Sequence, residues 1–448
     1  MIESMKQIVR PLWVIILISV VSVDVVAQQR RETDEELQML ADHVFYLSEI
    51  MLHDVASPPA AGRVYAYAML GAHEIASMVK GRVPQLNERL HADPRMRLVN
   101  VPKKVDLSFC SNYTILEVGR QLMPSGYLLE EKKQGLVEHI KSRGQFSDRE
   151  TAQQVRFALE VAGQIISYAK NDGYNKLSTF ARYTPKKGDG FWFPTPPAYM
   201  GAVEPQWKTL RPFYLDSASQ FAPPPPVSFS KDTASAFFKQ MNEVYDITRK
   251  LTEEERAIAN FWDCNPFNVS FSGHMAIGLK KISPGGHWMG ITGIACKKAN
   301  LPLDSAIFVH TVVATTVHDA FISCWQEKFN SDRIRPETAI NKYVDADWRP
   351  LLQTPPFPEY SSGHSVVSGA VSVVLTRLLG DNFTFIDTSE VYFGLPERTF
   401  KSFYEAASEA AISRLYGGIH FRDACEEGLE QGRRVGHHVL NKIAHFQP

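Results

Sequence analysis

Three short motifs in the second half of the sequence combine cationic, histidine and small polar residues. The first contains Lys328 and Arg335, whose seven-residue spacing is close to two helical turns and would place both cations on one helix face. Pro336 disfavours helical backbone at Arg335, so we expect the helix to end there. Two cations at a helix end can bind one anion, Lys as a point charge and Arg as a planar fork. Taken alone, this motif is more typical of a solvated basic helix end.

The second motif runs from Pro358 to His364 and precedes an apolar stretch. Ser362 can cap a helix that starts here and donate its hydroxyl, and Gly363 can expose its N–H to a ligand. Helix N-termini bind anions through free N–H groups and the helix dipole. His364 would stand at the mouth of such a site, able to donate or accept a proton near neutral pH. An ordinary serine cap beside an uninvolved histidine explains this motif alone equally well.

The third motif places two glycines between Arg414 and His420. On an unbroken helix these two side chains would point about 120° apart. Gly417 and Gly418 can end the helix and fold His420 back toward Arg414. We expect Asp423 to cap the next helix and to hold the second imidazole nitrogen of His420, which would fix its tautomer. The plainer alternative is a helix that ends at glycine, with neighbours brought there by chance.

Together the motifs supply two Arg, one Lys, two His, a Ser and a Gly N–H, a set of groups that suits a buried, highly charged tetrahedral anion. Phosphoryl chemistry needs such a set, with charge neutralised on the equatorial oxygens, a nucleophile on one axis and an acid on the other. The sequence therefore predicts that the C-terminal half binds a tetrahedral oxyanion.

Helical periodicity dominates the elements that must position these motifs. Thr33 and Glu36 predict a capping box at the start of a long helix that ends at Pro58 and Pro59. Asp304 is expected to cap the most apolar helix, residues 305–328, whose length favours a helix although residues 307–313 could form a strand. We expect further helices at residues 364–379, 399–415 and 423–444, a turn at residues 285–288, and no hairpins. The predicted fold class is all-α, a helical bundle.

A proline-rich and aromatic stretch, residues 179–230, separates the two halves of the chain. We therefore predict three parts: a signal peptide at residues 1–27, an N-terminal helical domain with the proline-rich connection at 28–230, and the oxyanion-binding domain at 231–448. Lys6 and Arg10 precede an apolar run that is shorter than the ~20 residues a bilayer requires. We expect cleavage before Gln28, export to the periplasm or the extracellular space, and no stable membrane span.

The composition excludes several classes of protein. A net charge of −1, with 22% charged residues, gives no basic excess that would indicate a nucleic-acid partner. Five cysteines at wide, irregular spacing do not form a disulfide framework, although one disulfide stays possible. No CxxC pair indicates a metal site, so we expect buried, apolar cysteines.

The order Lys-x6-Arg-Pro, Ser-Gly-His and Ser-Arg-x5-His resembles the vanadium-dependent haloperoxidase and type 2 phosphatidic acid phosphatase superfamily. The resemblance covers residues 304–444 well and residues 261–293 loosely. It implies that His420 is the apical ligand of vanadium or the nucleophile that becomes phosphohistidine, with His364 as acid and base on the opposite side. The residues that it assigns to the oxyanion's oxygens are Lys328, Arg335, Ser362, the Gly363 amide and Arg414.

Within this superfamily, the details of the resemblance favour a haloperoxidase over a phosphatase. Trp325 and Phe357 stand where similar residues of chloroperoxidases flank the halide. Asp423 follows His420 by three residues, whereas four is the expected spacing in chloroperoxidases. Asp263 is a candidate partner of Arg414, although a purely structural pairing fits equally well.

The sequence leaves three functional hypotheses open. The leading hypothesis is a vanadate-dependent haloperoxidase acting on peroxide and a halide. The alternatives are an acid phosphatase that hydrolyses a phosphate ester through phosphohistidine without a cofactor, and a non-enzymatic secreted protein that binds an anion.

Overall fold

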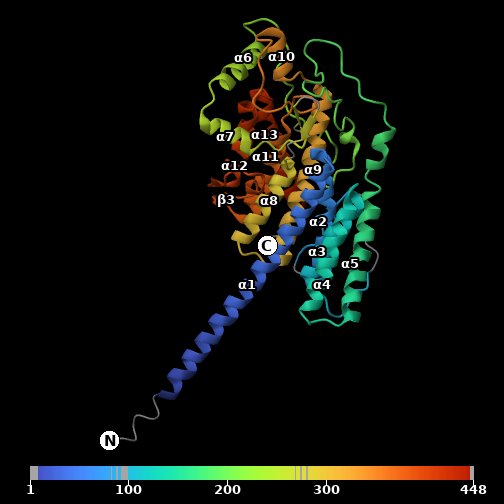
Figure 1. Ribbon diagram of the computed structural model, residues 1–448, viewed down its shortest axis with the longest axis vertical. Coiled ribbons are helices and arrows are strands. Elements are labelled where there is room, and N and C mark those ends of the chain that lie inside the picture. The colour runs from blue at the N-terminus through green and yellow to red at the C-terminus, as the bar shows by residue number, and fades with distance from the viewer. Residues whose placement is uncertain are drawn as a thin grey trace.

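The computed structural model describes residues 9–443 except 82, 87–88, 92–98, 268, 273–274 and 279–280, and only the backbone of residues 9–29 and 269–278. The described chain is mainly helical (Figure 1), which confirms the predicted fold class. Two short antiparallel hairpins accompany the helices, contrary to the prediction of none. They pair β1 (Val269–Ser272) with β2 (Met275–Gly278), and β3 (Phe385–Asp387) with β4 (Arg398–Phe400).

The described α-helices of the first half of the chain are α1 (Val9–His53), α2 (Pro58–Lys80), α3 (Leu107–Leu122), α4 (Glu130–Ser142) and α5 (Asp148–Ala169). The predicted start at Thr33 is wrong, because α1 runs through this residue without a break. Pro58 and Pro59 do not end a helix but begin α2, after the cap Ser57. A proline at the first helical position costs nothing, because its missing N–H would have no partner inside the helix. The following segment, residues 170–235, contains only the short 3-10 helices η3 (Tyr174–Thr179) and η4 (Trp207–Thr209).

The described α-helices of the second half are α6 (Ala236–Arg249), α7 (Glu253–Phe261), α8 (Pro284–Lys298), α9 (Leu303–Ser331), α10 (Pro336–Tyr343), α11 (Gly363–Leu379), α12 (Phe403–Tyr416) and α13 (Arg422–Ile443). The possible strand at residues 307–313 is helical, as the length argument favours. Asp304 lies inside the first turn of α9 and does not cap it, because the N-cap position falls on Pro302. Residues 399–400 belong to β4, so α12 begins later than predicted.

The predicted turn at residues 285–288 is wrong, because these residues form the first turns of α8, capped by Ser283. The two glycines serve close packing. A Cβ at Gly286 would lie 2.7 Å from the Tyr65 hydroxyl, and one at Gly285 would lie 2.9 Å from Val317. Glycine therefore lets α8 approach α2 and α9 more closely than any other residue would.

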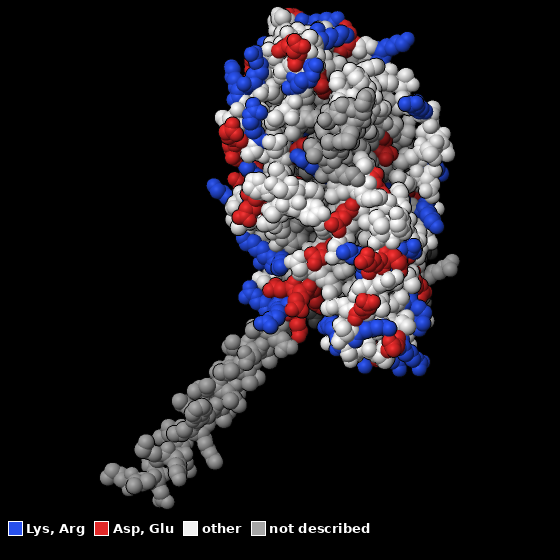
Figure 2. Space-filling view, viewed as in Figure 1, with Lys and Arg blue, Asp and Glu red and all other residues white. Residues whose placement is uncertain are grey.

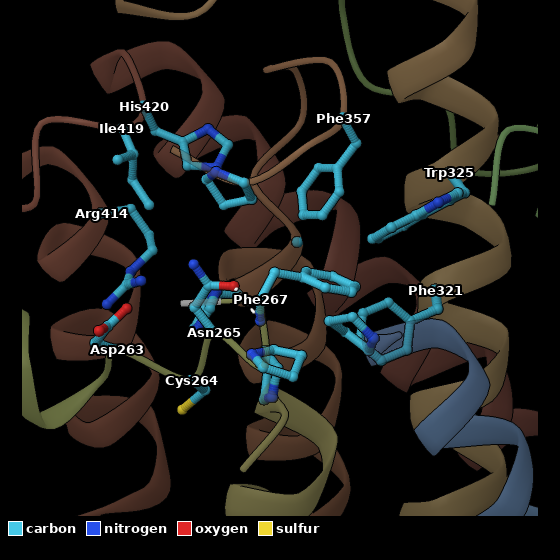
Figure 3. A pocket seen from close by; sticks show the side chains of 16 residues that line it. Asp263, Cys264, Asn265, Phe267, Phe321, Trp325, Phe357, Arg414, Ile419 and His420 are labelled. Atoms are coloured by element: carbon cyan, nitrogen blue, oxygen red, sulfur yellow. Dashed lines mark hydrogen bonds between the residues drawn. The ribbon is translucent and has the colours of Figure 1, made fainter. Parts of the chain in front are cut away.

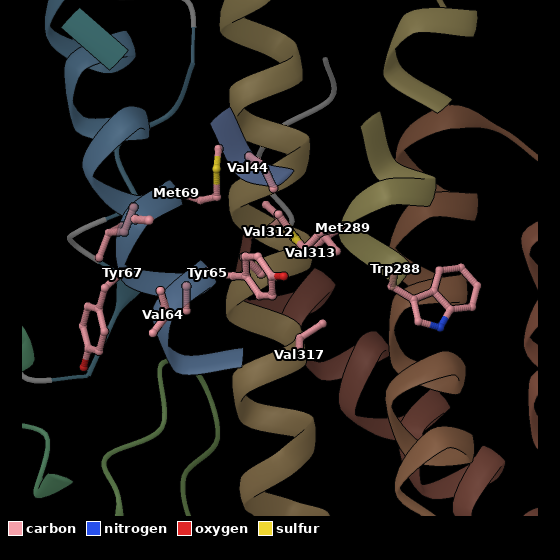
Figure 4. Close-up of a cluster of buried hydrophobic side chains, with 14 of the residues drawn as sticks. Val44, Val64, Tyr65, Tyr67, Met69, Trp288, Met289, Val312, Val313 and Val317 are labelled. Atoms are coloured by element: carbon pink, nitrogen blue, oxygen red, sulfur yellow. The ribbon is translucent and has the colours of Figure 1, made fainter. Parts of the chain in front are cut away.

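The longest apolar helix of the second half, α9, lies at the centre of the molecule, between α2 on one side and α11 and α8 on the other (Figure 1). Figure 4 shows how Tyr65 and Met69 of α2 face Val312 and Val313 of α9 within one hydrophobic cluster. This cluster joins side chains from both sides of residue 230. The two segments on either side of the predicted domain boundary at residue 230 therefore share one hydrophobic core.

By length and hydropathy α9 could cross a membrane, which the sequence analysis did not anticipate. Its most apolar 18-residue window is 100% buried inside the protein, as in the core helix of a globular fold. On the face in Figure 2, cationic and acidic side chains are interspersed, in keeping with the near-zero net charge.

Candidate active site

The loop before α11 gathers the cations of the first motif. Lys328 Nζ donates hydrogen bonds to the carbonyl oxygens of Pro358 and Glu359, both at 3.0 Å. Arg335 Nε donates to the carbonyl that precedes these two in the loop, that of Phe357, at 2.9 Å. The two cations do not share one helix face as predicted, because α9 ends at Ser331 and Arg335 directly precedes α10. The turn between these helices, together with three successive carbonyls, brings the two side chains together.

Two neighbours hold His420 in one tautomer. Its Nδ1 lies 2.8 Å from Glu359 Oε1, and a carboxylate accepts hydrogen bonds, so Nδ1 carries the proton. Arg335 Nη1 lies 3.2 Å from Nε2, and a guanidinium only donates, so Nε2 carries the lone pair. The arrangement leaves the nitrogen that faces the cations unprotonated, which is the form that binds a metal or attacks an electrophile.

The predicted contact between Asp423 and His420 is wrong. Asp423 accepts instead from Arg333 Nη1 at 2.7 Å, and the same nitrogen lies 3.4 Å from Glu359 Oε2. The third residue after His420 already lies in the first turns of α13, which direct its carboxylate toward Arg333. Glu359 takes the role that was predicted for Asp423. Glu359 and Arg333 were not predicted from the sequence, although a lone acidic residue within the second motif was a usable signal.

Arg414 anchors the C-terminal end of α7. Its Nη2 donates to the carbonyl oxygens of Trp262 at 2.6 Å and Ala259 at 3.3 Å, groups that have no partner within the helix. As predicted, α12 ends just after Arg414, and Gly418 has a φ of +75°, which turns the chain back toward the site. Arg414 and His420 therefore line the same pocket.

The second motif begins α11 as predicted. Ser362 is the N-cap, and its hydroxyl accepts hydrogen bonds from the Ser365 N–H at 3.3 Å and from the Ser365 hydroxyl at 2.9 Å. Gly363 and His364 follow in the first turn and line the pocket. The half-buried His364 ring bonds to the backbone of Trp262, and its Nε2 is buried without a hydrogen-bond partner. This nitrogen is available to a ligand in the pocket.

Burial of several cations together controls the protonation of the site. Burial lowers the pKa of Lys328 to about 7, and burial likewise lowers that of Arg335 to about 10. Burial, together with Arg335, Lys328 and Arg414, holds the pKa of His420 well below its usual value. Burial, together with Arg414 and His420, likewise holds the pKa of His364 well below its usual value. Both imidazoles are therefore neutral near pH 7, and a bound anion would offset the repulsion among the cations.

The pocket has a polar side and an aromatic side (Figure 3). Arg414, Asp263 and His420 lie on one side, and Phe357, Trp325 and Phe321 lie on the other. The rings of Trp325 and Phe357 contact each other with centroids 5.0 Å apart. Lys328 Nζ lies 5.1 Å from the centre of the Phe357 ring, so the aromatic wall borders the cations directly.

In the described structure the predicted residues line the pocket or adjoin residues that line it, except Asp423. Asp263 lies beside Arg414 in the pocket and opposes the lowering of the Arg414 pKa by burial. Its Oδ2 also forms an ion pair with Lys281 Nζ at 2.9 Å. Lys328 contacts the pocket residue Phe357, Arg335 contacts His420, and Ser362 caps the helix that carries Gly363 and His364. Buried cations, an unprotonated imidazole nitrogen and a second neutral imidazole can bind an oxyanion and exchange a proton with it.

Comparisons with known proteins point to a family. Residues 342–447 match the family model of the VCPO second helical-bundle domain. The comparison with curated protein sequences gives no match. The crystal structure of the first bacterial vanadium-dependent iodoperoxidase is 43% identical in sequence and superposes with a TM-score of 0.83, over 90% of this chain and 96% of that one.

Two further structures share the fold at low identity. The holo-type bacterial vanadium-dependent chloroperoxidase is 15% identical, with a TM-score of 0.62 over 88% of this chain and 94% of that one. The apo-type enzyme is also 15% identical, with a TM-score of 0.63 over 85% of this chain and 92% of that one. Similarity at 43% identity over nearly the full length of both chains shows the family. This chain belongs to the vanadium-dependent haloperoxidases, a family of enzymes.

Proposed function

We propose that this enzyme binds vanadate at His420 Nε2 and uses hydrogen peroxide to oxidise a halide, with iodide as the first candidate. The observation that carries the proposal is the fixed tautomer of His420, whose unprotonated Nε2 faces Arg335. The family supports the reaction class, and the iodoperoxidase neighbour supports the choice of iodide. In this reaction peroxide, halide and one proton give hypohalous acid and water.

The residues of the site fit a tetrahedral oxyanion. Arg335 Nη2 is buried without a hydrogen-bond partner, which is costly unless a ligand accepts from it. Lys328 uses two of its three N–H donors on the loop carbonyls and keeps one for a ligand. With Arg414 and the N-terminus of α11, these groups would hold the oxygens of vanadate, and His420 would hold the metal.

When bound, vanadate supplies the Lewis acidity that activates peroxide toward a halide. The chain's own contribution is orientation and proton transfer. His364 is neutral near pH 7 because burial and the neighbouring charges lower its pKa, and its Nε2 has no partner. It can therefore accept a proton from an incoming peroxide and return that proton to the departing water. Glu359 holds the proton on His420 Nδ1, so that Nε2 stays a ligand.

The aromatic side of the pocket is the proposed halide site. Trp325 and Phe357 offer a dry, polarisable wall, and Lys328 lies 5.9 Å and 5.1 Å from the centres of their rings. A large, weakly hydrated anion such as iodide gains from contact with aromatic ring edges while a nearby cation balances its charge. Replacement of Trp325 by Phe should change kcat/KM for halides and leave vanadate affinity nearly unchanged.

The test is a paired assay of one preparation. Vanadate-loaded protein with peroxide should oxidise iodide, and this oxidation should stop when vanadate is removed by chelation and dialysis. The vanadate-free protein is then given a chromogenic phosphate ester. Efficient ester hydrolysis without vanadate-dependent halide oxidation would establish the acid phosphatase alternative, and neither activity would leave only anion binding.

We also propose that the protein is exported with its mature chain beginning near Gln28. The proposal rests on the charged, apolar and small-residue regions that end at Ala27. Intact-mass measurement of the protein recovered outside the cytoplasm tests it. A membrane-bound chain that retains residues 12–27 would contradict it.

A further inference from the structure

A second cluster of functional groups is buried beneath the oxyanion pocket. It consists of Cys264, from the segment after α7, His287 from α8, and Asp387 and Glu390, which flank the turn between β3 and η5 (Val391–Phe393). All four side chains are buried, and Cys264 also lines the pocket (Figure 3). The oxyanion site described above does not use them.

Three ligand atoms of this cluster converge. His287 Nδ1 lies 3.4 Å from Cys264 Sγ and 3.3 Å from Glu390 Oε1. All three atoms lie within 4.8 Å of one another, the one such group found in the part of the chain that the structure describes. Two ligands of a tetrahedral zinc ion, at ordinary Zn–S and Zn–N bond lengths, are about 3.3–3.6 Å apart. The spacing therefore already matches a zinc coordination sphere.

The ring nitrogen of His287 that points away from Cys264 and Glu390 contacts a carboxylate, as is common for histidines that bind a metal. Its Nε2 lies 2.8 Å from Asp387 Oδ2, whose partner oxygen Oδ1 accepts from the Ser389 hydroxyl at 2.7 Å and the Ser389 N–H at 2.9 Å. A carboxylate on the distal nitrogen of a metal-bound histidine fixes the ring and raises its basicity. Asp387 therefore directs the Nδ1 lone pair of His287 toward Cys264 and Glu390.

An independent observation also indicates a ligand. Glu390 is 2% exposed, and its Oε1 is buried without a hydrogen-bond partner. The 3.3 Å contact with His287 Nδ1 does not satisfy this oxygen as a hydrogen bond would, and a cation between the two atoms would stabilise the buried carboxylate.

We propose that Cys264, His287 and Glu390 bind a zinc ion. One thiolate, one imidazole and one carboxylate form a mixed ligand set that suits Zn²⁺ rather than Mg²⁺ or Ca²⁺, and three protein ligands leave a fourth position for water. The absence of a CxxC pair argued against a metal site at the sequence level, but the ligands come from three separate segments. The proposal goes beyond the haloperoxidase function and does not depend on it.

The position of the cluster gives the ion a structural role next to the active site. The Trp262 ring stacks on His287 with centroids 4.4 Å apart, and the Trp262 carbonyl accepts from Arg414 at 2.6 Å. A zinc ion would tie the segment that carries Trp262 and Cys264 to α8 and to the turn at Glu390. It would thereby fix the carbonyl that positions Arg414 in the oxyanion pocket.

The test uses full-length, vanadate-free protein stripped with a chelator and titrated with Co²⁺, then with Zn²⁺. We expect one Co²⁺ per chain, with a thiolate-to-cobalt charge-transfer band in the near ultraviolet that Zn²⁺ abolishes. Cys264→Ser should remove the band, and Glu390→Gln, which keeps the side-chain volume, should weaken binding at least tenfold. His420→Ala should bind Co²⁺ as the wild type does, which separates this site from the vanadate site.

Cys296 provides the matched control, because its Sγ also lies beside a buried histidine, 3.9 Å from His310 Nδ1. Cys296→Ser should keep the charge-transfer band. The proposal is overturned if the folded wild-type protein takes up no Co²⁺ or Zn²⁺, or if both Cys264→Ser and Glu390→Gln bind it as the wild type does. Circular dichroism of each variant shows whether it is folded, and if Cys264→Ser is not, Glu390→Gln decides alone.

Discussion

His420 is held between a carboxylate and a guanidinium, and this pairing sets its chemistry. Glu359 accepts a hydrogen bond from Nδ1–H, and Arg335 faces the Nε2 lone pair. A 180° rotation of the imidazole ring would therefore lose both contacts. Burial among cations keeps the ring neutral by lowering its pKa well below the usual range. The residue is thereby prepared as a metal ligand before any oxyanion arrives.

Replacement of Glu359 by Gln tests this arrangement. The amide keeps the volume of the side chain but removes the negative charge that raises the basicity of His420. We expect vanadate affinity to fall by roughly 10- to 100-fold, the usual effect of losing the partner of a metal-bound histidine. Asp423→Asn is the control, because Asp423 contacts Arg333 and not His420, and it should reduce the affinity much less. Equal losses in both variants, measured by calorimetry, would contradict the assignment.

At the scale of elements, the site depends on where α11 begins and where α12 ends. The N-terminus of α11 supplies Ser362–His364, and close helix packing fixes its direction: a Cβ at Gly369 or Gly432 would lie 2.3 Å or 2.0 Å from a carbonyl oxygen of the facing helix. The end of α12 places His420 through a left-handed turn at Gly418. These helix ends, rather than the helix interiors, carry the chemistry.

Gly418→Ala tests the contribution of the turn. The positive φ and the nearby Pro350 and Thr248, both 3.1 Å from an added Cβ, make alanine unfavourable by about 1–2 kcal/mol or more. Gly81, with a φ of +63° and no atom within 4 Å of an added Cβ, offers the same backbone strain far from the site. We expect both alanine variants to lower Tm, but only Gly418→Ala to weaken vanadate binding. A Gly418→Ala protein with wild-type vanadate affinity would show that the turn does not position His420.

The sequence predicted most helices and the three motifs, because apolar periodicity and caps such as Ser362 are local signals. It could not predict which side chains meet across the motifs. Glu359 reaches His420 from 61 positions away, and Asp423, closer in sequence, is directed elsewhere by α13. Gly285 and Gly286 led to the prediction of a turn, but they lie in a helix. Glycine is needed there because Tyr65 and Val317 of other helices pack closely against the backbone. Contacts between distant segments are decided by tertiary packing, which a single sequence does not encode locally.

At the scale of the whole molecule, one core connects both halves of the chain. Tyr65 of α2 and Val313 of α9 belong to the same buried cluster, although the proline-rich connection separates them in sequence. Since α9 also carries Trp325 and Lys328, the N-terminal half supports the helix that positions the pocket wall. The first half therefore has a structural part in the active site without supplying the residues of the three motifs.

Buried histidines make the stability of the molecule depend on pH. Burial lowers the pKa of His310 to about 4, from 6.5 for an exposed ring. Between these two values the unfolded chain binds a proton that the folded protein does not, so this residue's contribution is lost as the pH falls from 6.5 toward 4. His310→Met should flatten the dependence of unfolding free energy on pH by up to about 1.4 kcal/mol per pH unit in this window. Urea unfolding at several pH values measures this dependence. An unfolding free energy whose slope against pH is the same in His310→Met and the wild type would contradict a buried, neutral His310.

The most direct measurement of the central claim is a vanadate titration of the wild type, His420→Ala and His364→Ala by calorimetry, with halide oxidation measured in parallel. The account predicts one vanadate per wild-type chain and no detectable binding to His420→Ala. It predicts that His364→Ala still binds vanadate but loses turnover by roughly 10²–10⁴-fold, the usual share of a general acid and base. Wild-type vanadate affinity in His420→Ala, or full turnover in His364→Ala, would contradict it.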